Sequence, residues 1–405
     1  MKVVMVVPYF PKLSETFIVS KFVGLLDQGI DVHIFCNGSN HSEWNNFSVL
    51  LNHSELRKRI HINWPTTPRI AAAVLFLPAL LSSFFIKPLA TFRFLKIGLK
   101  DHVIKVFKEF YLDRELILLK PDILHYEFGA LAVEKEYIKK RINCKLVASF
   151  RGHDIYFVGL ESRNYYMELW TKVDAVHFLG TALYKKAVSR GFKASIPYAL
   201  IPPAIDPKKF APSEKQVDTS KREFIKILSI GRLHWAKGYE YALQALCNLY
   251  DRGYRFEYHI VGGGDEFDCL TFCCHQQKIN ENVTFLGSVP PEQVYEELKW
   301  ADIFLHPAVE EGFGNVVIEA QAMQLPVICS DAVGLPENVE NGVTGFVVPR
   351  RNPQELAEKL ILLAQDPNLR LKMGEEGRKR VIEKFQNSDQ IRAFYNLYQE
   401  VMKKE

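Results

Sequence analysis

A chain of 405 residues is too long for one ordinary hydrophobic core, which excludes a single small domain and makes two domains the expectation. With 48% hydrophobic and 24% charged residues, the composition is that of an ordinary globular protein. The net charge of +4 conceals an asymmetry, because residues 1–200 carry 27 Lys and Arg against 17 Asp and Glu, whereas residues 201–405 carry 24 against 30. A basic half can face nucleic acid or an anionic membrane, or it can be a solvated surface without a partner.

The cysteines and the first residues bear on the location of the protein. Seven cysteines are an odd number without the spacing of a disulfide framework, so reduced thiols are expected. Residues 1–8 predict a buried strand, which is too short for a signal peptide and lacks a small-residue cleavage site. These features predict a cytoplasmic protein.

Short apolar runs alternate with helical patterns along most of the chain. Strands are predicted near residues 3–7, 32–35, 123–125, 146–150, 175–178 and 198–201, and again near 225–230, 256–261, 283–286, 303–306, 327–329 and 345–348. Strands separated by helices form parallel sheets that are covered on both faces. The predicted fold class is therefore α/β, with two doubly wound Rossmann-like domains.

The domain boundary is expected at the prolines of residues 202–207, which precede a polar run over residues 213–223. The first domain would span residues 1–203 and the second residues 204–384. Because ligands bind beyond the carboxyl ends of strands in such sheets, we expect the two domains to face each other across a cleft that holds one active site.

Polar side chains follow three predicted strands of the first half. Ser14 and Thr16 lie in the loop after the first strand. Each is a candidate helix N-cap, or a residue that contacts one of two substrates, a donor that carries a diphosphate or an acceptor. His125 ends another strand and is a candidate acceptor-side residue. His153 follows a third strand and is expected to contact substrate, with Asp154 orienting it or binding a hydroxyl.

Residues 70–86 form a run of seventeen residues without a charge, interrupted by Pro78 and flanked by Arg69 and Lys87. The run is short for a membrane span, and the proline is expected to break a single helix. Further basic residues extend to Lys100. We therefore predict that residues 69–100 rest on an anionic membrane surface with an apolar face toward the lipid, the alternative being ordinary packed helices.

In the second half, residues 231–238 follow a predicted strand and contain Arg232 and Lys237. The planar guanidinium of Arg232 and the compact ammonium group of Lys237 suit a diphosphate, which they would stabilise as it departs. A basic turn with a purely structural role is the alternative.

Neither a metal nor a dinucleotide cofactor is indicated. The sequence has no Asp-x-Asp pair, and the cysteines at 269, 273 and 274 with the histidine at 275 are interpreted as packing residues on one helix. Gly262, Gly263 and Gly264 allow a ligand to approach closely. They are consecutive, however, and do not match a dinucleotide fingerprint, which argues against a nicotinamide oxidoreductase.

The most informative stretch is residues 306–319, His-Pro-Ala-Val-Glu-Glu-Gly-Phe-Gly-Asn-Val-Val-Ile-Glu. Glu311 lies in a glycine loop after a strand, and Glu319 lies about one turn into the helix predicted over residues 315–323. Backbone amides at the glycines and at the helix start form an anion site. An anion site between two carboxylates suits a ligand that is both a phosphate and a polyol.

These motifs, in this order, resemble the retaining glycosyltransferases of family 4, which have the GT-B fold. The matching pieces are residues 231–233, 237–238, 262–266, 285–287, 311–314, 319–320, 326–327, 334, 336–337 and 342–345. Residues 10–18 and 125–129 resemble the exopolysaccharide transferases of the colanic-acid type. The resemblance also implies that a last helix, within residues 385–405, crosses back to complete the first domain.

The resemblance implies a role for each site residue. Catalytic roles fall to Glu311, His153, Arg232 and Lys237, and acceptor-side roles to Ser14, Thr16, His125 and Asp154. Donor binding falls to Arg232, Lys237, Gly262, Gly264, Gly287, Val289, Glu311, Gly312, Phe313, Gly314, Asn315, Val316 and Glu319. Within this set, Glu311 would lie by the donor sugar and Glu319 would bind the ribose hydroxyls.

The expected function is transfer of a hexose, with retention, from a nucleotide diphosphate sugar to a lipid-linked or oligosaccharide acceptor in exopolysaccharide or cell-surface glycan synthesis. A UDP-sugar is favoured as donor, no metal or cofactor is expected, and the location is the inner face of the cell membrane. Nucleic acid is not an expected partner. The alternatives are a nucleotide-sugar epimerase and a catalytically silent sugar- or membrane-binding subunit.

Overall fold

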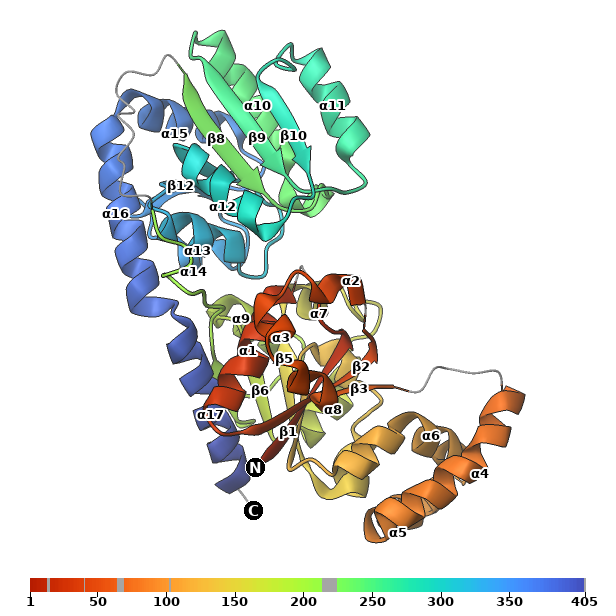
Figure 1. Ribbon diagram of the computed structural model, residues 1–405. Coiled ribbons are helices and arrows are strands. Elements are labelled where there is room, and N and C mark those ends of the chain that lie inside the picture. Colours follow the sequence, from red (N-terminus) through yellow and green to blue (C-terminus); the bar gives the residue numbers. More distant parts are fainter. Residues whose placement is uncertain (13–14, 40, 64–68, 102, 213–223, 404–405) are drawn as a thin grey trace. The chain divides into compact units, whose positions relative to one another are not determined.

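The computed structural model describes residues 1–12, 15–39, 41–63, 69–101, 103–212 and 224–403. The chain divides into two compact units. Unit 1 contains Met1–Phe178, Tyr184–Ile201 and Ile391–Glu405, and unit 2 contains Leu179–Leu183 and Pro202–Gln390. Each unit is built on one parallel sheet (Figure 1), which confirms the predicted α/β fold with two Rossmann-like domains.

Unit 1 contains a seven-stranded parallel sheet. Its strands are β1 (Lys2–Tyr9), β2 (Asp31–Gly38), β3 (Ile60–Ile62), β4 (Ile123–Tyr126), β5 (Lys145–Phe150), β6 (Ala175–Phe178) and β7 (Tyr198–Leu200). They lie in the order β3-β2-β1-β4-β5-β6-β7. The edge strand β3 was not predicted, because it has only three residues and exposes Ile62, so it forms no apolar run.

The helices of unit 1 cover both faces of this sheet or extend beyond it. They are α1 (Thr16–Asp27), α2 (His41–Trp44), α3 (Ser48–Leu51), η2 (Ser54–Arg59), α4 (Arg69–Ile86), α5 (Pro88–Asp101), α6 (Val103–Leu119), η3 (Gly129–Ala132), η4 (Lys139–Asn143), α7 (Gly152–Tyr156), α8 (Met167–Lys172) and most of α9 (Thr181–Ser189). The last helix, α17 (Asn387–Lys403), buries Phe394, Leu397 and Tyr398 in the core of unit 1.

Helix α4 continues through Pro78, so the prediction that this proline breaks the helix is wrong. A proline inside a helix removes one hydrogen bond and costs roughly 3 kcal/mol, which packing elsewhere must offset. Here α4 packs against α6, where the ring of Phe76 meets Phe107 and Phe110 edge to face at centroid distances of 5.2 and 5.7 Å. Ala79, one residue after the proline, is buried in the same contact region.

A cluster of buried charges lies where α1, β4 and β5 of unit 1 meet. The Nζ atom of Lys21 is 2.5 Å from Glu127, and Arg151 approaches the other carboxylate oxygen of Glu127 at 3.1 Å. Burial lowers the pKa of Lys21 to about 8, although Glu127 opposes that shift. His125 lies beside this pair and bonds Tyr398 of α17 at 2.6 Å, so the cluster joins α17 to the sheet.

We predict that Glu127→Gln strongly destabilises unit 1. The substitution leaves Lys21 and Arg151 buried without their counter-charge, and breaking such a pair costs roughly 3–5 kcal/mol. Denaturant unfolding followed by tryptophan fluorescence measures this loss. The control is Glu55→Gln, at an exposed glutamate whose pairing with His53 is open to solvent, and equal stability of the two variants would contradict the prediction.

Unit 2 contains a six-stranded parallel sheet in the order β10-β9-β8-β11-β12-β13. The strands are β8 (Ile225–Ile230), β9 (Phe256–Val261), β10 (Val283–Gly287), β11 (Ile303–His306), β12 (Val327–Ser330) and β13 (Gly345–Val348). The helical segments are η6 (Trp235–Lys237), α10 (Tyr239–Asp251), α11 (Phe267–Gln276), α12 (Pro291–Trp300), α13 (Asn315–Ala322), α14 (Leu335–Asn338), α15 (Pro353–Gln365) and α16 (Pro367–Lys384). The order of the strands reverses between β8 and β11, so the helices that follow these two strands, α10 and α13, pack on opposite faces of the sheet.

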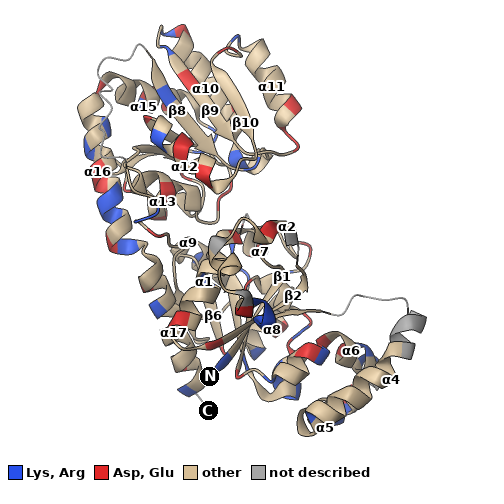
Figure 2. Ribbon diagram, in the orientation of Figure 1, with Lys and Arg blue, Asp and Glu red and all other residues tan. Residues whose placement is uncertain are grey.

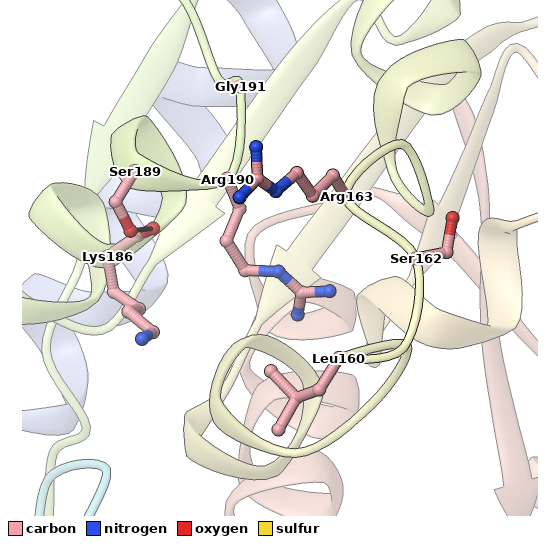
Figure 3. A pocket seen from close by; sticks show the side chains of 7 residues that line it. All are labelled: Leu160, Ser162, Arg163, Lys186, Ser189, Arg190 and Gly191. Atoms are coloured by element: carbon pink, nitrogen blue, oxygen red, sulfur yellow. Dashed lines mark hydrogen bonds between the residues drawn. The ribbon is translucent and has the colours of Figure 1, made fainter.

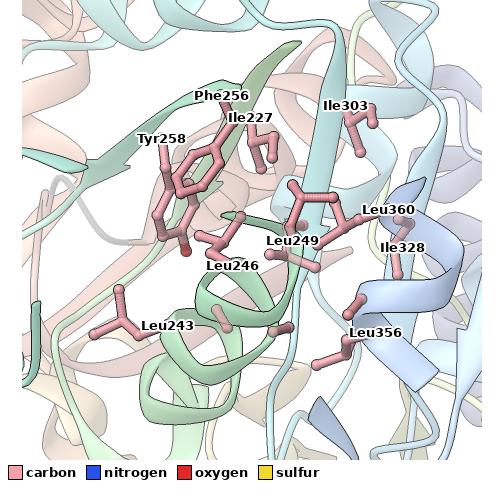
Figure 4. Packing of buried hydrophobic residues seen from close by; sticks show 14 of the residues in the cluster. Ile227, Leu243, Leu246, Leu249, Phe256, Tyr258, Ile303, Ile328, Leu356 and Leu360 are labelled. Carbon is pink, nitrogen blue, oxygen red and sulfur yellow. The ribbon is translucent and has the colours of Figure 1, made fainter. Parts of the chain in front are cut away.

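Both faces of this sheet are packed. Ile227 of β8 packs with Leu246 of α10 and Leu360 of α15 (Figure 4). Its neighbour Leu228 points to the opposite face and packs in the cluster that contains Val317 of α13. Because successive strand residues face opposite sides, a strand buried on both faces appears in the sequence as a continuous apolar run.

Candidate active site

The loops after β8 and β11 lie against each other at the carboxyl edge of the unit 2 sheet. The backbone N–H of Val309 donates to the carbonyl of Ala236 at 2.8 Å, and that of Glu310 donates to the same oxygen at 3.1 Å. Gly238 has φ +66°, and a Cβ there would lie 2.3 Å from the carbonyl oxygen of Pro307. A glycine at 238 therefore allows the two loops to approach, and this contact brings residues 236–238 against residues 307–310.

The centre of this edge is an ion pair between Lys237 and Glu311. The Nζ atom of Lys237 lies 2.5 Å from Oε2 of Glu311, and Nε2 of His306 lies 3.1 Å from the same oxygen. Burial alone would raise the pKa of Glu311, but Lys237 and His306 outweigh it and hold that pKa well below the usual range. Glu311 is therefore an ionised carboxylate at neutral pH.

This pairing adds to the sequence interpretation. The sequence assigned Lys237 to the diphosphate and Glu311 to the donor sugar, without a contact between the two residues. In the structure, Lys237 neutralises Glu311 directly. A lysine ammonium has three N–H donors, however, so Lys237 can keep this bond and still donate to a phosphate oxygen.

His306 is a site residue that sequence reasoning missed. It is the last residue of β11 and is buried, and burial lowers its pKa although Glu311 opposes the shift. A carboxylate only accepts hydrogen bonds, so a neutral His306 donates its Nε2 proton to Glu311. The available signal was its position, since it is the final strand residue before the glycine loop that carries Glu311.

The glycine loop leads directly into the amino terminus of α13. Gly314 is in the left-handed region at φ +88°, and a Cβ there would lie 2.7 Å from the side chain of Leu335. The N–H of Val317 bonds the carbonyl of Gly314 at 3.0 Å. The first amides of a helix have no partner within the helix, so those of Asn315 and Val316 are placed to bind an anion, which the helix dipole also favours.

The same loop is held in place from behind. The buried side-chain amide of Asn338 on α14 donates to the carbonyl of Phe313. The N–H of Gly334 donates to the carbonyl of Glu311 at 3.1 Å, and a Cβ on Gly334 would lie 2.2 Å from the carbonyl oxygen of Gly312. The loop therefore has little freedom to shift when a ligand binds.

Glu319 has an environment opposite to that of Glu311. It lies one turn into α13, and desolvation by burial raises its pKa to about 7. The two carboxylates of the motif thus differ in protonation at neutral pH, as expected for groups with separate roles. A half-protonated Glu319 can both donate and accept hydrogen bonds, which suits a pair of vicinal hydroxyls.

The remaining predicted donor residues follow β8, β9 and β10 on this edge. Arg232 is exposed on the loop after β8. Gly264 lies so close to that loop that a Cβ would lie 2.2 Å from the carbonyl oxygen of Leu233, and the N–H of Gly262 bonds the carbonyl of Gly287 at 2.8 Å. These two glycines therefore hold the loops after β8, β9 and β10 close together. That they contact a donor stays a prediction, and so does a contact from the half-buried side chain of Val289.

The residues predicted on the acceptor side lie in unit 1 and differ in accessibility. His153 is exposed on α7, after β5. His125 is fully buried and also bonds Ser149 at 2.7 Å, so in this structure its ring is not open to an acceptor. Thr16 is exposed as the first residue of α1, which makes the N-cap assignment wrong because Glu15 occupies that position. The other candidate cap, residue 14, lies outside the described residues.

Asp154 has a structural position rather than one beside a ligand. Its two carboxylate oxygens accept the backbone N–H groups of Ala130 and Arg151, each at 3.2 Å. The side chain is buried, and this desolvation raises its pKa. Both oxygens thus fix the turn that carries His153, so Asp154 positions His153 through the backbone and is not open to a hydroxyl in this structure.

A hollow of about 470 Å³ in unit 1 contains none of the predicted site residues (Figure 3). Its lining includes Leu160, Arg163, Lys186 and Arg190. The guanidinium of Arg190 donates to three backbone carbonyls, those of residues 155, 158 and 159. Arg190 thus holds the wall of the hollow together, and we assign no ligand to it.

The cysteines and the possible metal ligands can be checked over the described residues. All seven cysteines are free thiols. Over the described ranges, no group of three or more His, Cys, Asp or Glu side chains could hold a metal ion.

Comparisons with known proteins show which family and which relatives the chain resembles. Residues 211–380 match the family model of the glycosyl transferases group 1. The chain is 32% identical over 216 residues to the D-inositol 3-phosphate glycosyltransferase of Corynebacterium jeikeium, which covers 50% of this chain and 51% of that protein. It is 27% identical over 379 residues to the amylovoran biosynthesis glycosyltransferase AmsK of Erwinia amylovora, which covers 90% and 91%.

The fold is also that of solved glycosyltransferase structures. The structure of Anabaena HepE in complex with UDP and glucose superposes with a TM-score of 0.73 at 15% identity, over 99% of this chain and 100% of that one. Two Rossmann-like domains of this kind define the GT-B fold. Residues 211–380 match the glycosyl transferases group 1 and the chain has the GT-B fold of these structures, which supports the resemblance found in the sequence.

The raised pKa of Glu319 predicts a pH-dependent stability effect. The Glu319 carboxyl titrates near 4.5 in the unfolded chain and near 7 in the folded one. Its contribution to the free energy of unfolding is therefore complete below about pH 4.5 and is lost as the pH rises through 7, where the folded protein must bury a charged carboxylate. Glu319→Gln removes this cost of burying the charge and should stabilise the free protein at pH 8 by about 1–3 kcal/mol, with little change at pH 4.5. Denaturant unfolding at both pH values measures the difference. The exposed Glu358→Gln is the control, and an equal effect at both pH values would refute the assignment.

Proposed function

We propose that the protein transfers a hexose from a nucleotide diphosphate sugar to a saccharide acceptor in exopolysaccharide or cell-surface glycan synthesis. The observation that carries the proposal is the Lys237–Glu311–His306 cluster, which lies beside the amide-lined start of α13 at the switch point of a group 1 glycosyltransferase domain. The similarity to AmsK over nine-tenths of both chains supports a polysaccharide pathway.

The donor site is charged in a way that suits a departing diphosphate. The exposed guanidinium of Arg232 can donate two parallel hydrogen bonds to phosphate oxygens. Lys237 and the first amides of α13 add positive potential on the same edge. Fixed donors of this kind stabilise the charge that develops on the leaving group, so the chain can promote departure with its own residues.

Glu311 is proposed as the residue nearest the reacting carbon. A glycosyl group that loses its leaving group develops positive charge, which an ionised carboxylate stabilises. We propose that the acceptor attacks from the face the leaving group departs from, so that the configuration is retained and a donor phosphate oxygen takes the acceptor proton. Lys237 and His306 would keep Glu311 ionised and in place throughout, as positioning residues.

The acceptor is proposed to be a lipid-linked or oligosaccharide hydroxyl at the inner face of the cell membrane. On this proposal, the exposed His153 contacts the sugar near the acceptor. UDP is the proposed nucleotide, as in the HepE complex. Its ribose hydroxyls would bond Glu319, and its base would lie near the loop around residues 287–289.

Glu311→Gln should reduce kcat by about 10²–10³-fold and leave donor binding nearly intact, because it removes charge that matters most in the transition state. Glu310→Gln is a matched control, since it changes the adjacent carboxylate of the same loop, which faces Arg350 instead. Transfer is measured with labelled donor and a membrane-extracted acceptor. Equal losses in both variants, or none in Glu311→Gln, would contradict the role of Glu311.

A thermal-shift screen over UDP-, GDP- and ADP-sugars tests the donor assignment. At a ligand concentration about 100 times Kd, binding should stabilise the protein by about 2.7 kcal/mol. We expect the largest shift with a UDP-sugar and a loss of most of that shift in Arg232→Ala. Arg252→Ala, an exposed arginine at the end of α10, should keep it. Stabilisation by none of the three would reject the donor site.

The transfer assay with labelled donor also separates a transferase from the alternative functions. A transferase releases free nucleotide only when acceptor is present, and the anomeric configuration of its product, measured by nuclear magnetic resonance, reports retention. An epimerase converts the donor sugar without acceptor. A silent subunit would bind donor and release nothing, and Glu311→Gln would then leave cellular polysaccharide unchanged.

A further inference from the structure

The outer faces of α4 and α5 expose large apolar side chains. Leu77, Leu81 and Phe85 recur every four residues, so they lie on one face of α4, and they are 58%, 53% and 88% exposed. Leu89 and Phe92 continue the exposed surface on α5, at 85% and 56%. We call these five residues the α4–α5 patch. Exposed apolar residues scattered singly are ordinary, but such a concentration marks an interaction site.

The opposite faces of the same helices are packed, so the exposure does not come from loosely held helices. Phe94 of α5 is fully buried and meets Phe110 of α6 at a centroid distance of 6.0 Å. At the corner between α4 and α5, the hydroxyl of Thr91 donates to the carbonyl of Ser83 at 3.1 Å, and the hydroxyl of Ser83 donates to that of Ala79 at 2.7 Å. These bonds satisfy the buried polar groups and fix which faces point outward.

The charged residues of the segment that carries the patch, residues 69–100, are all of one sign. Residues 69–100 contain five Lys and Arg and no Asp or Glu. Lys87, Lys96 and Lys100 are exposed, and Nζ of Lys96 lies 5.8 Å from the ring centroid of Phe92. Figure 2 shows basic residues on α5, and the acidic residue of this helix is its last one, Asp101, which pairs with Arg141 at 3.5 Å, whereas α6 carries both signs. Lysines beside apolar side chains can extend toward lipid headgroups while their stems stay against the apolar surface.

We propose that the α4–α5 patch inserts into the headgroup region of an anionic lipid bilayer. Apolar side chains with lysines at their edge, and no carboxylate within residues 69–100, are the composition of an interfacial membrane-binding helix. Among the described helices, none is long and apolar enough to cross a membrane. A second copy is a poorer occupant, because a symmetric contact would bring two carboxylate-free basic segments together.

Co-sedimentation with lipid vesicles tests this proposal on the full chain. The wild-type protein should bind vesicles of phosphatidylcholine mixed with phosphatidylglycerol, and bind vesicles of phosphatidylcholine alone more weakly. Phe85→Ser with Leu89→Ser should lower the partition coefficient for the mixed vesicles by about tenfold or more, because two apolar side chains no longer leave water. Lys96→Glu with Lys100→Glu should lower it for the mixed vesicles only.

The matched control is Phe272→Ser, which removes a phenylalanine that is 61% exposed on α11 of unit 2 and should leave vesicle binding unchanged. Thermal unfolding and the donor-induced thermal shift should be the same in every variant, which separates membrane binding from folding and from the proposed transfer. Failure of the wild-type protein to bind mixed vesicles, or equal binding by the Phe85 and Leu89 double variant, would overturn the proposal. Self-association that this double variant abolishes, without vesicle binding, would assign the patch to a second copy.

Discussion

The arrangement of unit 2 depends on one contact, the ion pair of Lys237 and Glu311. It joins two loops that leave the sheet on either side of the reversal in strand order. Two half-buried charges are favoured by close pairing and by further hydrogen bonds, one of which His306 supplies. The close approach at Gly238 and the support of Asn338 behind the loop can both be understood as means of keeping this pair aligned.

Much of the fold could be predicted from the sequence, because a strand buried on both faces leaves a continuous apolar run that periodicity detects. The strand of residues 60–62 left no such run, since one of its isoleucines is exposed. The proline in α4 was misjudged for a related reason. Its local cost was visible in the sequence, whereas the aromatic packing of Phe76 that offsets it depends on residues about thirty positions away.

The candidate site could also be predicted only in part. The glycine loop, both carboxylates and the basic residues Arg232 and Lys237 were found from residue type and strand-end position. Their pairing was not, because whether Lys237 faces a ligand or Glu311 depends on side-chain directions that spacing does not encode. The suggestion that Asp154 binds a hydroxyl failed for the converse reason. A carboxylate beside a histidine suggests chemistry, yet the backbone N–H groups from which Asp154 accepts hydrogen bonds leave no pattern in the sequence.

The helix α17 has a consequence for the order of folding during synthesis. Phe394 and Tyr398 complete the core of unit 1, and Tyr398 bonds His125 beside the buried pair of Lys21 and Glu127. Domains generally fold in the order in which they leave the ribosome. Here the first domain begins earliest and finishes last, because its core stays open until residue 401 has been made. The whole of unit 2 is translated while buried charges of unit 1 are still uncovered, so the nascent chain passes through a long-lived state in which its first half is incomplete.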